Sequence, residues 1–198
     1  MGHVLIDFDW SAVCAGFCKR ANFEGDDFKP VLKHLGSLGY ETGKIGTEMF
    51  LAELNRALKT EIDETEFTTL WNSTFVENLE MVKVLTKLKT AFRLYLLSNT
   101  NENHYGWIQQ TYDVARHFEE LILSYEVGHA KPDAPIYGEV MARSGLAAKQ
   151  CLFVDDLEEN IIAAREAGMQ AILFTSPEAL HHELLDYGVD LNQLGLSS

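Results

Sequence analysis

The fold of this chain is restricted most by four short apolar runs, each of which is followed by polar or charged side chains. The runs cover residues 4–6, 94–97, 121–123 and 152–154. They are apolar at successive positions rather than at alternate ones, which is the pattern of strands covered on both faces. Such strands belong to parallel sheets with helices on either side. The sequence therefore predicts an α/β fold built on a doubly wound, Rossmann-like parallel sheet.

Side chains that suit phosphate chemistry follow these runs in a fixed order. Carboxylates come first and last, with hydroxyl, amide and ammonium groups between them: Asp7, Asp9, Ser98, Asn99, Lys131, Asp155, Asp156 and Asn160. Ligands bind at the carboxyl ends of parallel strands, so we expect these distant segments to form a single site. Together the groups predict magnesium-dependent phosphoryl transfer.

The first two carboxylates suit covalent catalysis. Asp7, at the end of the first run, can attack phosphorus as a nucleophile and form an aspartyl-phosphate. Asp9 is placed to protonate the leaving alcohol and then to take a proton from water, a role that predicts a raised pKa for Asp9. A lone Asp-x-Asp is more often a loop or a helix cap. Only its place in the ordered set favours the catalytic interpretation.

The middle groups suit phosphate binding. Ser98 supplies a hydroxyl, and the backbone N–H groups at Asn99 can hold phosphate oxygens where the next helix begins. Lys131 lies in a polar loop before a helix, where its ammonium group can pair with the nucleophile and the phosphoryl oxygens. A turn and a solvated lysine are the plainer interpretations of the same residues.

The pair Asp155 and Asp156 points in two directions at a strand end, so we expect only one of them to reach a metal directly. Magnesium prefers one or two carboxylates, completed by water and phosphate oxygens. Asp7 and Asp156 would supply them, with Asp155 and Asn160 supporting them through hydrogen bonds. The expected cofactor is therefore Mg²⁺, although an acidic helix start is the plainer interpretation of this last stretch.

Between the first two runs, the apolar period changes from that of strands to that of helices. Residues 12–83 carry apolar side chains at helical spacing, such as Phe50 and Leu54. We expect these residues to form a helical cap inserted after the first strand. Residues 1–11 and 84–198 then form the Rossmann-like core.

Local signals place several elements within this plan. Asp63 and Glu66 have the spacing of a capping box at a helix start. Asp133 can cap a helix that ends near Gly145. Residues 171–174 predict a fifth strand.

Composition narrows the classes of partner. The 198 residues carry a formal net charge of −14, which disfavours nonspecific binding to nucleic acid or to anionic membranes. A small phosphorylated metabolite needs only a locally positive pocket, and it is the expected partner. The three cysteines lack a Cys-x-x-Cys spacing, so we expect free thiols. Without a long apolar stretch or a signal peptide, the sequence predicts a cytoplasmic protein that does not span a membrane.

Taken in order, residues 4–11, 94–99, 131–133 and 153–160 resemble the four motifs of the haloacid dehalogenase superfamily of hydrolases. The resemblance spans essentially the whole chain, with residues 12–83 in the position of an inserted cap. The second and fourth segments look most like those of bacterial glucose-1-phosphate phosphatases and of the phosphatase domain of bifunctional epoxide hydrolases. The resemblance implies an Asp nucleophile and, as in most members, magnesium-dependent phosphatase activity.

Carried over by position, the resemblance assigns a role to each matching residue. It implies that Asp7 is the nucleophile and a metal ligand, and that Asp9 is the acid/base and binds the metal through its carbonyl oxygen. It further implies that Ser98 and Lys131 hold the phosphoryl group, and that Asp156 is the remaining protein ligand of the metal.

One position departs from the family pattern, because Trp10 and Ser11 stand where members usually have Gly-Thr. Serine keeps the hydroxyl, but tryptophan loses the freedom of glycine at positive φ, at a cost of about 1 kcal/mol if that conformation is needed. This departure bears on the shape of the pocket. The cap is expected to supply selectivity, with residues 40–44 as a specificity loop.

The sequence as a whole predicts a phosphatase that hydrolyses a small phosphate monoester, for example a sugar phosphate, through an aspartyl-phosphate. A 2-haloacid dehalogenase is disfavoured by Asp9, since the family's dehalogenases lack a carboxylate there. A phospho-acceptor receiver domain is disfavoured by the cap and by an acidic pair that comes last rather than first. A catalytically weak or silent binding protein of the same fold stays open because of Trp10.

Overall fold

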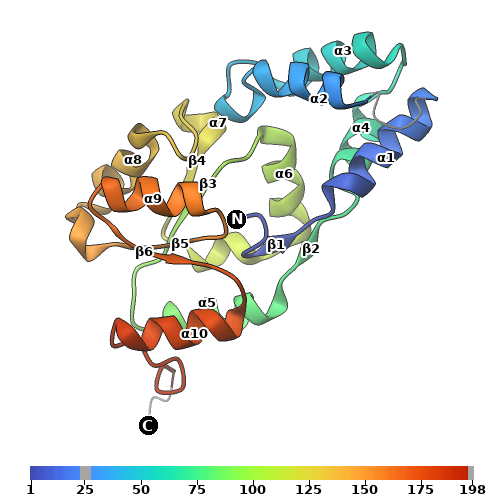
Figure 1. The fold of residues 1–198 in the computed structure, drawn as a ribbon. Helices are drawn as coiled ribbons and strands as arrows, with labels where there is room; N and C mark the ends of the chain where they lie inside the picture. The colour runs from blue at the N-terminus through green and yellow to red at the C-terminus, as the bar shows by residue number, and fades with distance from the viewer. Residues whose placement is uncertain (23–27, 196–198) are drawn as a thin grey trace.

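The computed structural model describes residues 1–22 and 28–195, and its helices and strands form a cap and a larger core (Figure 1). The cap elements are α1 (Trp10–Ala21), α2 (Phe28–Ser37), η2 (Tyr40–Thr42), α3 (Thr47–Leu58) and α4 (Glu64–Trp71). The core elements are β1 (Ile6–Asp7), β2 (Val76–Glu77), α5 (Leu79–Leu88), β3 (Tyr95–Ser98), α6 (Glu102–Thr111), η3 (Val114–His117), β4 (Glu120–Leu123), α7 (Ser124–Val127), α8 (Ala134–Ser144), η4 (Ala148–Gln150), β5 (Leu152–Asp155), α9 (Glu158–Glu166), β6 (Gln170–Leu173) and α10 (Pro177–Asp186).

Four of the predicted strands are present and pair in parallel, which confirms the α/β, Rossmann-like class. β3 pairs with β4, with Tyr95 opposite Glu120 and Ser98 opposite Leu123. β5 pairs with β6 in the same sense. Among the described residues the strands fall into three two-stranded sheets, so β3 and β5 are not hydrogen-bonded to each other.

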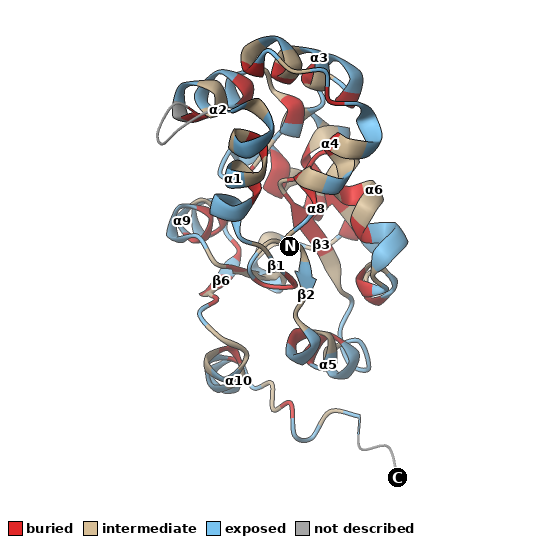
Figure 2. Cartoon of the chain, turned by 90° about the vertical axis from the view of Figure 1, so that its right-hand side faces the viewer, coloured by how far each residue is buried: buried red, intermediate tan, exposed pale blue. Residues whose placement is uncertain are grey.

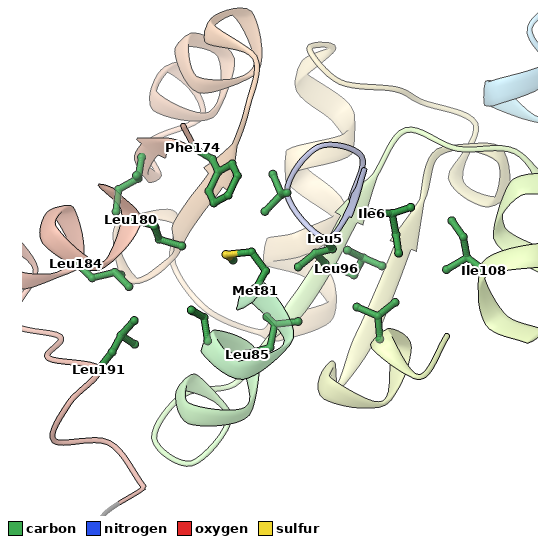
Figure 3. Packing of buried hydrophobic residues seen from close by; sticks show 14 of the residues in the cluster. Leu5, Ile6, Met81, Leu85, Leu96, Ile108, Phe174, Leu180, Leu184 and Leu191 are labelled. Atoms are coloured by element: carbon green, nitrogen blue, oxygen red, sulfur yellow. The ribbon is translucent and has the colours of Figure 1, made fainter. Parts of the chain in front are cut away.

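The first predicted strand is wrong in its placement. Residues 1–5 form a tight turn, in which the Leu5 amide donates to the Met1 carbonyl at 2.9 Å. The short β1 that follows pairs antiparallel with β2, outside the parallel sheets. Leu5 and Ile6 are nevertheless buried, in an apolar cluster that also holds Leu96 (Figure 3). The turn therefore buries the apolar side chains of residues 4–6 although these residues do not join the parallel sheets.

The apolar side chains separate the cap from the core. One cluster contains buried side chains of all the cap helices from α1 to α4, including Val13 and Trp71. Figure 2 shows these helices as a layer of their own above the core. Helix α5 belongs to the core cluster, because Met81, Val84 and Leu85 pack there. The boundary expected between residues 83 and 84 falls within this helix, and the division into cap and core stays a prediction.

Local helix signals agree well with the structure. Asp63 caps α4 by accepting a hydrogen bond from the Glu66 amide at 2.8 Å. Helix α8 begins directly after Asp133, but the Asp133 side chain makes no capping hydrogen bond, so the predicted cap is wrong in that respect. The helix ends at Ser144 and is followed by Gly145, whose φ of +70° is the left-handed conformation that glycine adopts without strain. Among the described residues, no helix is long and apolar enough to cross a membrane.

Candidate functional site

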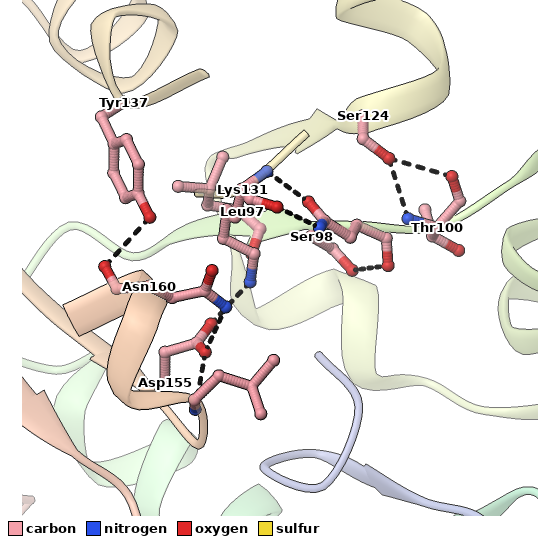
Figure 4. Close-up of polar contacts among 10 residues, drawn as sticks. Leu97, Ser98, Thr100, Ser124, Lys131, Tyr137, Asp155 and Asn160 are labelled. Atoms are coloured by element: carbon pink, nitrogen blue, oxygen red, sulfur yellow. Dashed lines mark hydrogen bonds and ion pairs between the residues drawn. The ribbon is translucent and has the colours of Figure 1, made fainter. Parts of the chain in front are cut away.

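A buried ion pair links the ends of β3 and β5. The Lys131 ammonium group donates to the Asp155 carboxylate at 2.6 Å and to the Leu97 carbonyl at 3.2 Å (Figure 4). The side chains of Lys131 and Asp155 are only 5% and 4% exposed, so solvent screens their attraction weakly. The structure thus brings two segments, 24 residues apart, together at the carboxyl edge of the strands.

Asp155 is held in place by further donors. Its other carboxylate oxygen accepts from the Asn160 side chain at 2.7 Å and from the Leu157 amide at 3.1 Å. Burial raises the pKa of Asp155, but the charge of Lys131 and these hydrogen bonds outweigh it and bring the pKa below its ordinary value. Tyr137 donates to the Asn160 carbonyl at 3.0 Å and steadies the helix start. Asp155 and Asn160 are therefore hydrogen-bonded to each other at the end of β5, and their support of a metal site stays a prediction.

Asn99 ties the lysine loop to the end of β3. The Asn99 side-chain NH₂ group donates to the Lys131 backbone carbonyl at 2.8 Å. The Asn99 side-chain oxygen accepts from the Lys131 backbone amide at 2.7 Å. Ser98 is buried beside it. These reciprocal bonds fix the backbone of Lys131 and so the base of its side chain.

Two further polar residues complete this edge and were missed from the sequence. The Ser124 hydroxyl accepts from the Thr100 amide at 2.9 Å and donates to the Thr100 carbonyl at 3.0 Å, and both residues are buried. The signal was present, because Ser124 directly follows the third apolar run, as Ser98 follows the second.

Asp9 is a helix cap in this structure. It accepts from the Ser11 amide at 2.9 Å, the Ser11 hydroxyl at 2.6 Å and the Ala12 amide at 3.2 Å, at the start of α1. The hydrogen bond from the Ser11 hydroxyl, followed by that from Ala12, lowers the pKa of Asp9. The predicted raised pKa is therefore wrong here, because the carboxylate is exposed and its charged form is stabilised by donors.

Trp10 causes none of the backbone conflict expected of it. It is the first residue of α1, and it is not among the described residues with positive φ. Its ring meets that of Trp71 edge-on, with centroids 4.9 Å apart. The side chain thus forms part of a wall between cap and core.

The expected metal ligands are not gathered together. Asp7 is exposed on the β1–β2 ribbon, Asp9 caps α1, and Asp156 is partly buried beside Asp155. Among the described residues, no group of three or more His, Cys, Asp or Glu side chains could hold a metal ion. The ligand set predicted from Asp7, Asp9 and Asp156 is therefore not assembled in this structure.

The amino group of Met1 takes a place near this edge instead. Burial, and then the positive charge of Lys131, lower its pKa to about 5, while Asp155 and Asp156 act in the opposite sense. The amino terminus thus lies in the field of the same three charged groups that form the core side of the site.

A cleft of about 480 Å³ lies between the cap and this edge of the core. Its walls are largely apolar and include Trp10, Tyr40, Trp71 and Phe75. Among the described residues that line it there is no lysine or arginine. The cleft therefore suits an uncharged organic group.

His104 adds a polar but uncharged group to the cleft. Its Nδ1 atom lies 2.8 Å from the Asn72 side-chain oxygen, and its ring stacks on Trp71 at 5.2 Å. Burial lowers the pKa of His104 to about 3, so the ring is neutral at pH 7.

Hydrogen bonds hold the cap against the core. The Thr47 hydroxyl donates to Glu102 at 2.6 Å, and the Thr47 amide at the start of α3 donates to the same carboxylate oxygen. The Asn103 side chain donates to the Thr68 hydroxyl at 2.7 Å. The predicted specificity loop also docks here, because a Cβ atom at Gly43 would lie 2.1 Å from the Tyr125 carbonyl oxygen. Glycine is needed at this close approach.

Comparison with known proteins identifies similar chains. The sequence model of the haloacid dehalogenase-like hydrolases matches residues 22–168. The D-ribitol-5-phosphate phosphatase of Bacteroides thetaiotaomicron is 27% identical over 177 residues, which cover 85% of this chain and 86% of that enzyme. A HAD family enzyme of the same species, solved in complex with magnesium and inorganic phosphate, is 27% identical, with a TM-score of 0.77 over 88% of this chain and 91% of that one. The sesquiterpene phosphatase of Aspergillus oryzae is 31% identical over 113 residues, which are 52% of this chain and 54% of that protein.

Proposed function

This chain belongs to the haloacid dehalogenase-like hydrolase family, and we propose that it is a phosphatase that hydrolyses small phosphate monoesters. The observation that carries the proposal is the buried pair of Lys131 and Asp155, which fixes a cation at the ends of β3 and β5. Relatives named as phosphatases support the same reaction class. Asn99 and Ala130 line the cleft next to Lys131, so an ester held in the cleft would lie near this edge.

Lys131 is suited to hold a phosphoryl oxygen. An ammonium group has three N–H donors, and here Asp155 and the Leu97 carbonyl take two of them. Among the described residues the third has no hydrogen-bond partner, which leaves it for an anion. The Ser98 hydroxyl and the backbone after it lie at the same strand end, so they are the nearest additional donors for phosphate oxygens.

Magnesium is the proposed cofactor, since a similar enzyme is solved with magnesium and inorganic phosphate. When bound, this ion supplies positive charge that stabilises the phosphoryl group. The described residues do not fit a complete site, however, because Asp156 is the only expected carboxylate ligand at this edge. Asp7, the expected nucleophile, lies on the ribbon and is not part of the proposed site.

The cleft suits an ester whose alcohol part carries no charge. Its aromatic walls can cover an apolar or sugar-like group, and neutral His104 adds no positive charge for a second phosphate. We therefore expect monophosphates such as aryl, polyol or isoprenoid phosphates to be better substrates than bisphosphates. The hydrogen bonds from Thr47 to Glu102 would keep the cap closed over the bound group.

The test is phosphate release from p-nitrophenyl phosphate and D-ribitol 5-phosphate, with and without magnesium, by the chain and by Asp156→Asn. Magnesium-dependent release that falls at least about 100-fold in the variant would support the proposal. The matched control is Glu158→Gln, an exposed acid two residues away, which should keep full activity. Binding of inorganic phosphate without turnover of either ester would contradict it and favour the silent binding protein.

A further inference from the structure

One carboxylate stands apart among the residues that line the cleft between cap and core. Glu41, in the middle of η2, is the only acidic side chain among the described residues of this lining. It is accessible to solvent, yet partial loss of hydration raises the pKa of its carboxyl group. A side chain that is both accessible and poorly hydrated suits the wall of a concave site, where a ligand can replace the missing water.

The η2 turn holds the backbone of Glu41 from two sides. The Gly43 amide closes the turn by donating to the Tyr40 carbonyl at 3.2 Å. On the cap side, the buried Tyr40 ring stacks on Phe50 with centroids 4.3 Å apart. On the core side, Gly43 comes so close to the Tyr125 carbonyl that only glycine fits there. The base of the Glu41 side chain is therefore fixed between two anchored residues.

The other polar side chains of the cleft already take part in hydrogen bonds within the protein. They are Tyr40, Thr42, Asn99, Thr100, Asn101 and His104. The Glu41 carboxylate differs, because no hydrogen bond or ion pair holds it among the residues that the structure describes. An acceptor in a partly dry site is costly unless a ligand supplies donors to it. Glu41 thus offers a ligand hydrogen-bonding capacity that the protein itself leaves unused.

Hydroxyl groups suit this carboxyl group better than an ammonium group does. An ionised carboxyl accepts from a hydroxyl, and a protonated one can also donate to it. Pairing with an ammonium group needs the ionised form, which the loss of hydration at Glu41 disfavours. A carboxyl group has two oxygens and can bind two neighbouring hydroxyls, while aromatic walls such as Trp10 and Trp71 cover the C–H groups of the same molecule.

We propose that Glu41 is a specificity-determining residue that binds hydroxyl groups of the substrate's alcohol part, which makes phosphate esters of polyhydroxy alcohols the preferred class. The inference rests on the proposed function, with the phosphoryl group held at Lys131. Asn99 and Ala130 line the cleft next to Lys131, and Glu41 lines it from the cap. One molecule in the cleft therefore presents its phosphate to the core and its hydroxyls to the cap. Alkyl and isoprenoid phosphates lack these hydroxyls and bind without the contact to Glu41.

The test compares two esters with the same six-carbon chain, sorbitol 6-phosphate and n-hexyl phosphate, which differ only in their hydroxyl groups. Glu41→Ala should lower kcat/KM for sorbitol 6-phosphate about 10- to 100-fold, the effect of losing a hydrogen bond to a carboxylate. It should leave kcat/KM for n-hexyl phosphate within about threefold of the parent value. An equal loss for both esters, or no loss for either, would overturn the proposal.

Two further variants sharpen this comparison. Glu41→Gln keeps an oxygen acceptor, so it should retain part of the preference for sorbitol 6-phosphate that Glu41→Ala loses. The matched control is Glu48→Ala, which removes an exposed glutamate of the cap helix α3 that does not line the cleft. It should leave both rates unchanged. A loss of preference in Glu48→Ala equal to that in Glu41→Ala would overturn the proposal, because the effect would then belong to the charge of the cap.

Binding without magnesium separates this inference from the phosphatase assignment. Trp10 and Trp71 line the cleft, so their fluorescence should report a bound ester in a sample that is not turning over. The dissociation constant of sorbitol 6-phosphate should rise about tenfold or more in Glu41→Ala, and that of n-hexyl phosphate should stay within about threefold. This result in a chain that hydrolyses neither ester would contradict the phosphatase and support the hydroxyl-binding role of Glu41. Equal constants for parent and variant, or no binding of sorbitol 6-phosphate, would overturn the proposal even if n-hexyl phosphate were hydrolysed.

Discussion

The two acidic pairs of this chain have similar local sequences and reach different surroundings. Asp155 ends β5, where parallel pairing with β6 and the ion pair with Lys131 fix its position, and Asp156 follows directly. Asp7 and Asp9 follow an equally apolar run, yet they lie on a short antiparallel ribbon and at a helix cap. The difference shows that an apolar run followed by aspartates predicts a site only when the run pairs with a neighbouring parallel strand, as β5 pairs with β6.

The largest effect on stability is expected at Lys131, the ion-pair partner of Asp155. Lys131→Ala leaves the buried Asp155 carboxylate without its partner. Breaking a buried pair in this way costs about 3 to 5 kcal/mol of unfolding free energy. Urea denaturation of the two proteins measures the loss.

The control for this variant is Lys149→Ala, which removes an exposed lysine on η4. It should change the free energy of unfolding by less than about 0.5 kcal/mol. A loss of under about 1 kcal/mol in Lys131→Ala would mean that the pair does not organise the core side of the site.

The same comparison explains how much the sequence could predict. The strands β3 to β6, the cap and the polar residues at Ser98, Lys131 and Asp155 follow from local apolar runs and their ends. The position of residues 4–6 does not follow, because a buried turn and a buried strand both satisfy an apolar run of three residues. The pairing of a strand is decided by contacts distant in sequence, which a local pattern does not contain.

The pKa shift predicted for Asp9 was wrong in its direction for a related physical reason. A carboxylate two residues before a serine and at a helix start is a good N-cap, and the structure uses it so. The two interpretations differ in the sign of the pKa shift rather than in the sequence pattern. Burial near other acids would raise the pKa of Asp9, whereas cap donors lower it.

An intermediate effect on stability is expected from His104, where the core helix α6 contacts Trp71 of the cap. Its pKa is about 3 in the folded chain and near 6.5 when unfolded, so acid favours the unfolded chain. The contribution of His104 is complete above pH 6.5 and is lost as the pH falls from 6.5 towards 3. The loss reaches about 2 kcal/mol by pH 5, measured by denaturation at both pH values.

His104→Gln should remove most of this acid sensitivity while keeping a donor for Asn72. The control His129→Gln alters an exposed histidine and should retain the full sensitivity. If the variant at position 104 kept the pH dependence of the parent, His104 would not be the group that titrates between these pH values.

A smaller effect is expected where the cap meets the core. Glu102→Ala removes the acceptor for the Thr47 amide and hydroxyl, and loss of such a helix cap costs about 1 kcal/mol. The cap should open more often, which limited proteolysis of α3 would report as faster cleavage. Glu102→Gln keeps an oxygen acceptor, so its rate of cleavage should lie between that of the parent and that of Glu102→Ala. Cleavage at the parent rate in Glu102→Ala would show that this carboxylate does not hold the cap.

The smallest effect is expected at Asp7 and tests the comparison most directly. Asp7 is exposed on the β1–β2 ribbon, so Asp7→Asn should change the free energy of unfolding by less than about 0.5 kcal/mol. It should also leave phosphate release within about threefold of the parent rate, whereas Asp156→Asn should abolish the response to magnesium. If Asp7→Asn kept its fold but lost turnover, the two acidic pairs would share one site, and the ribbon would have to rearrange to bring Asp7 to Lys131.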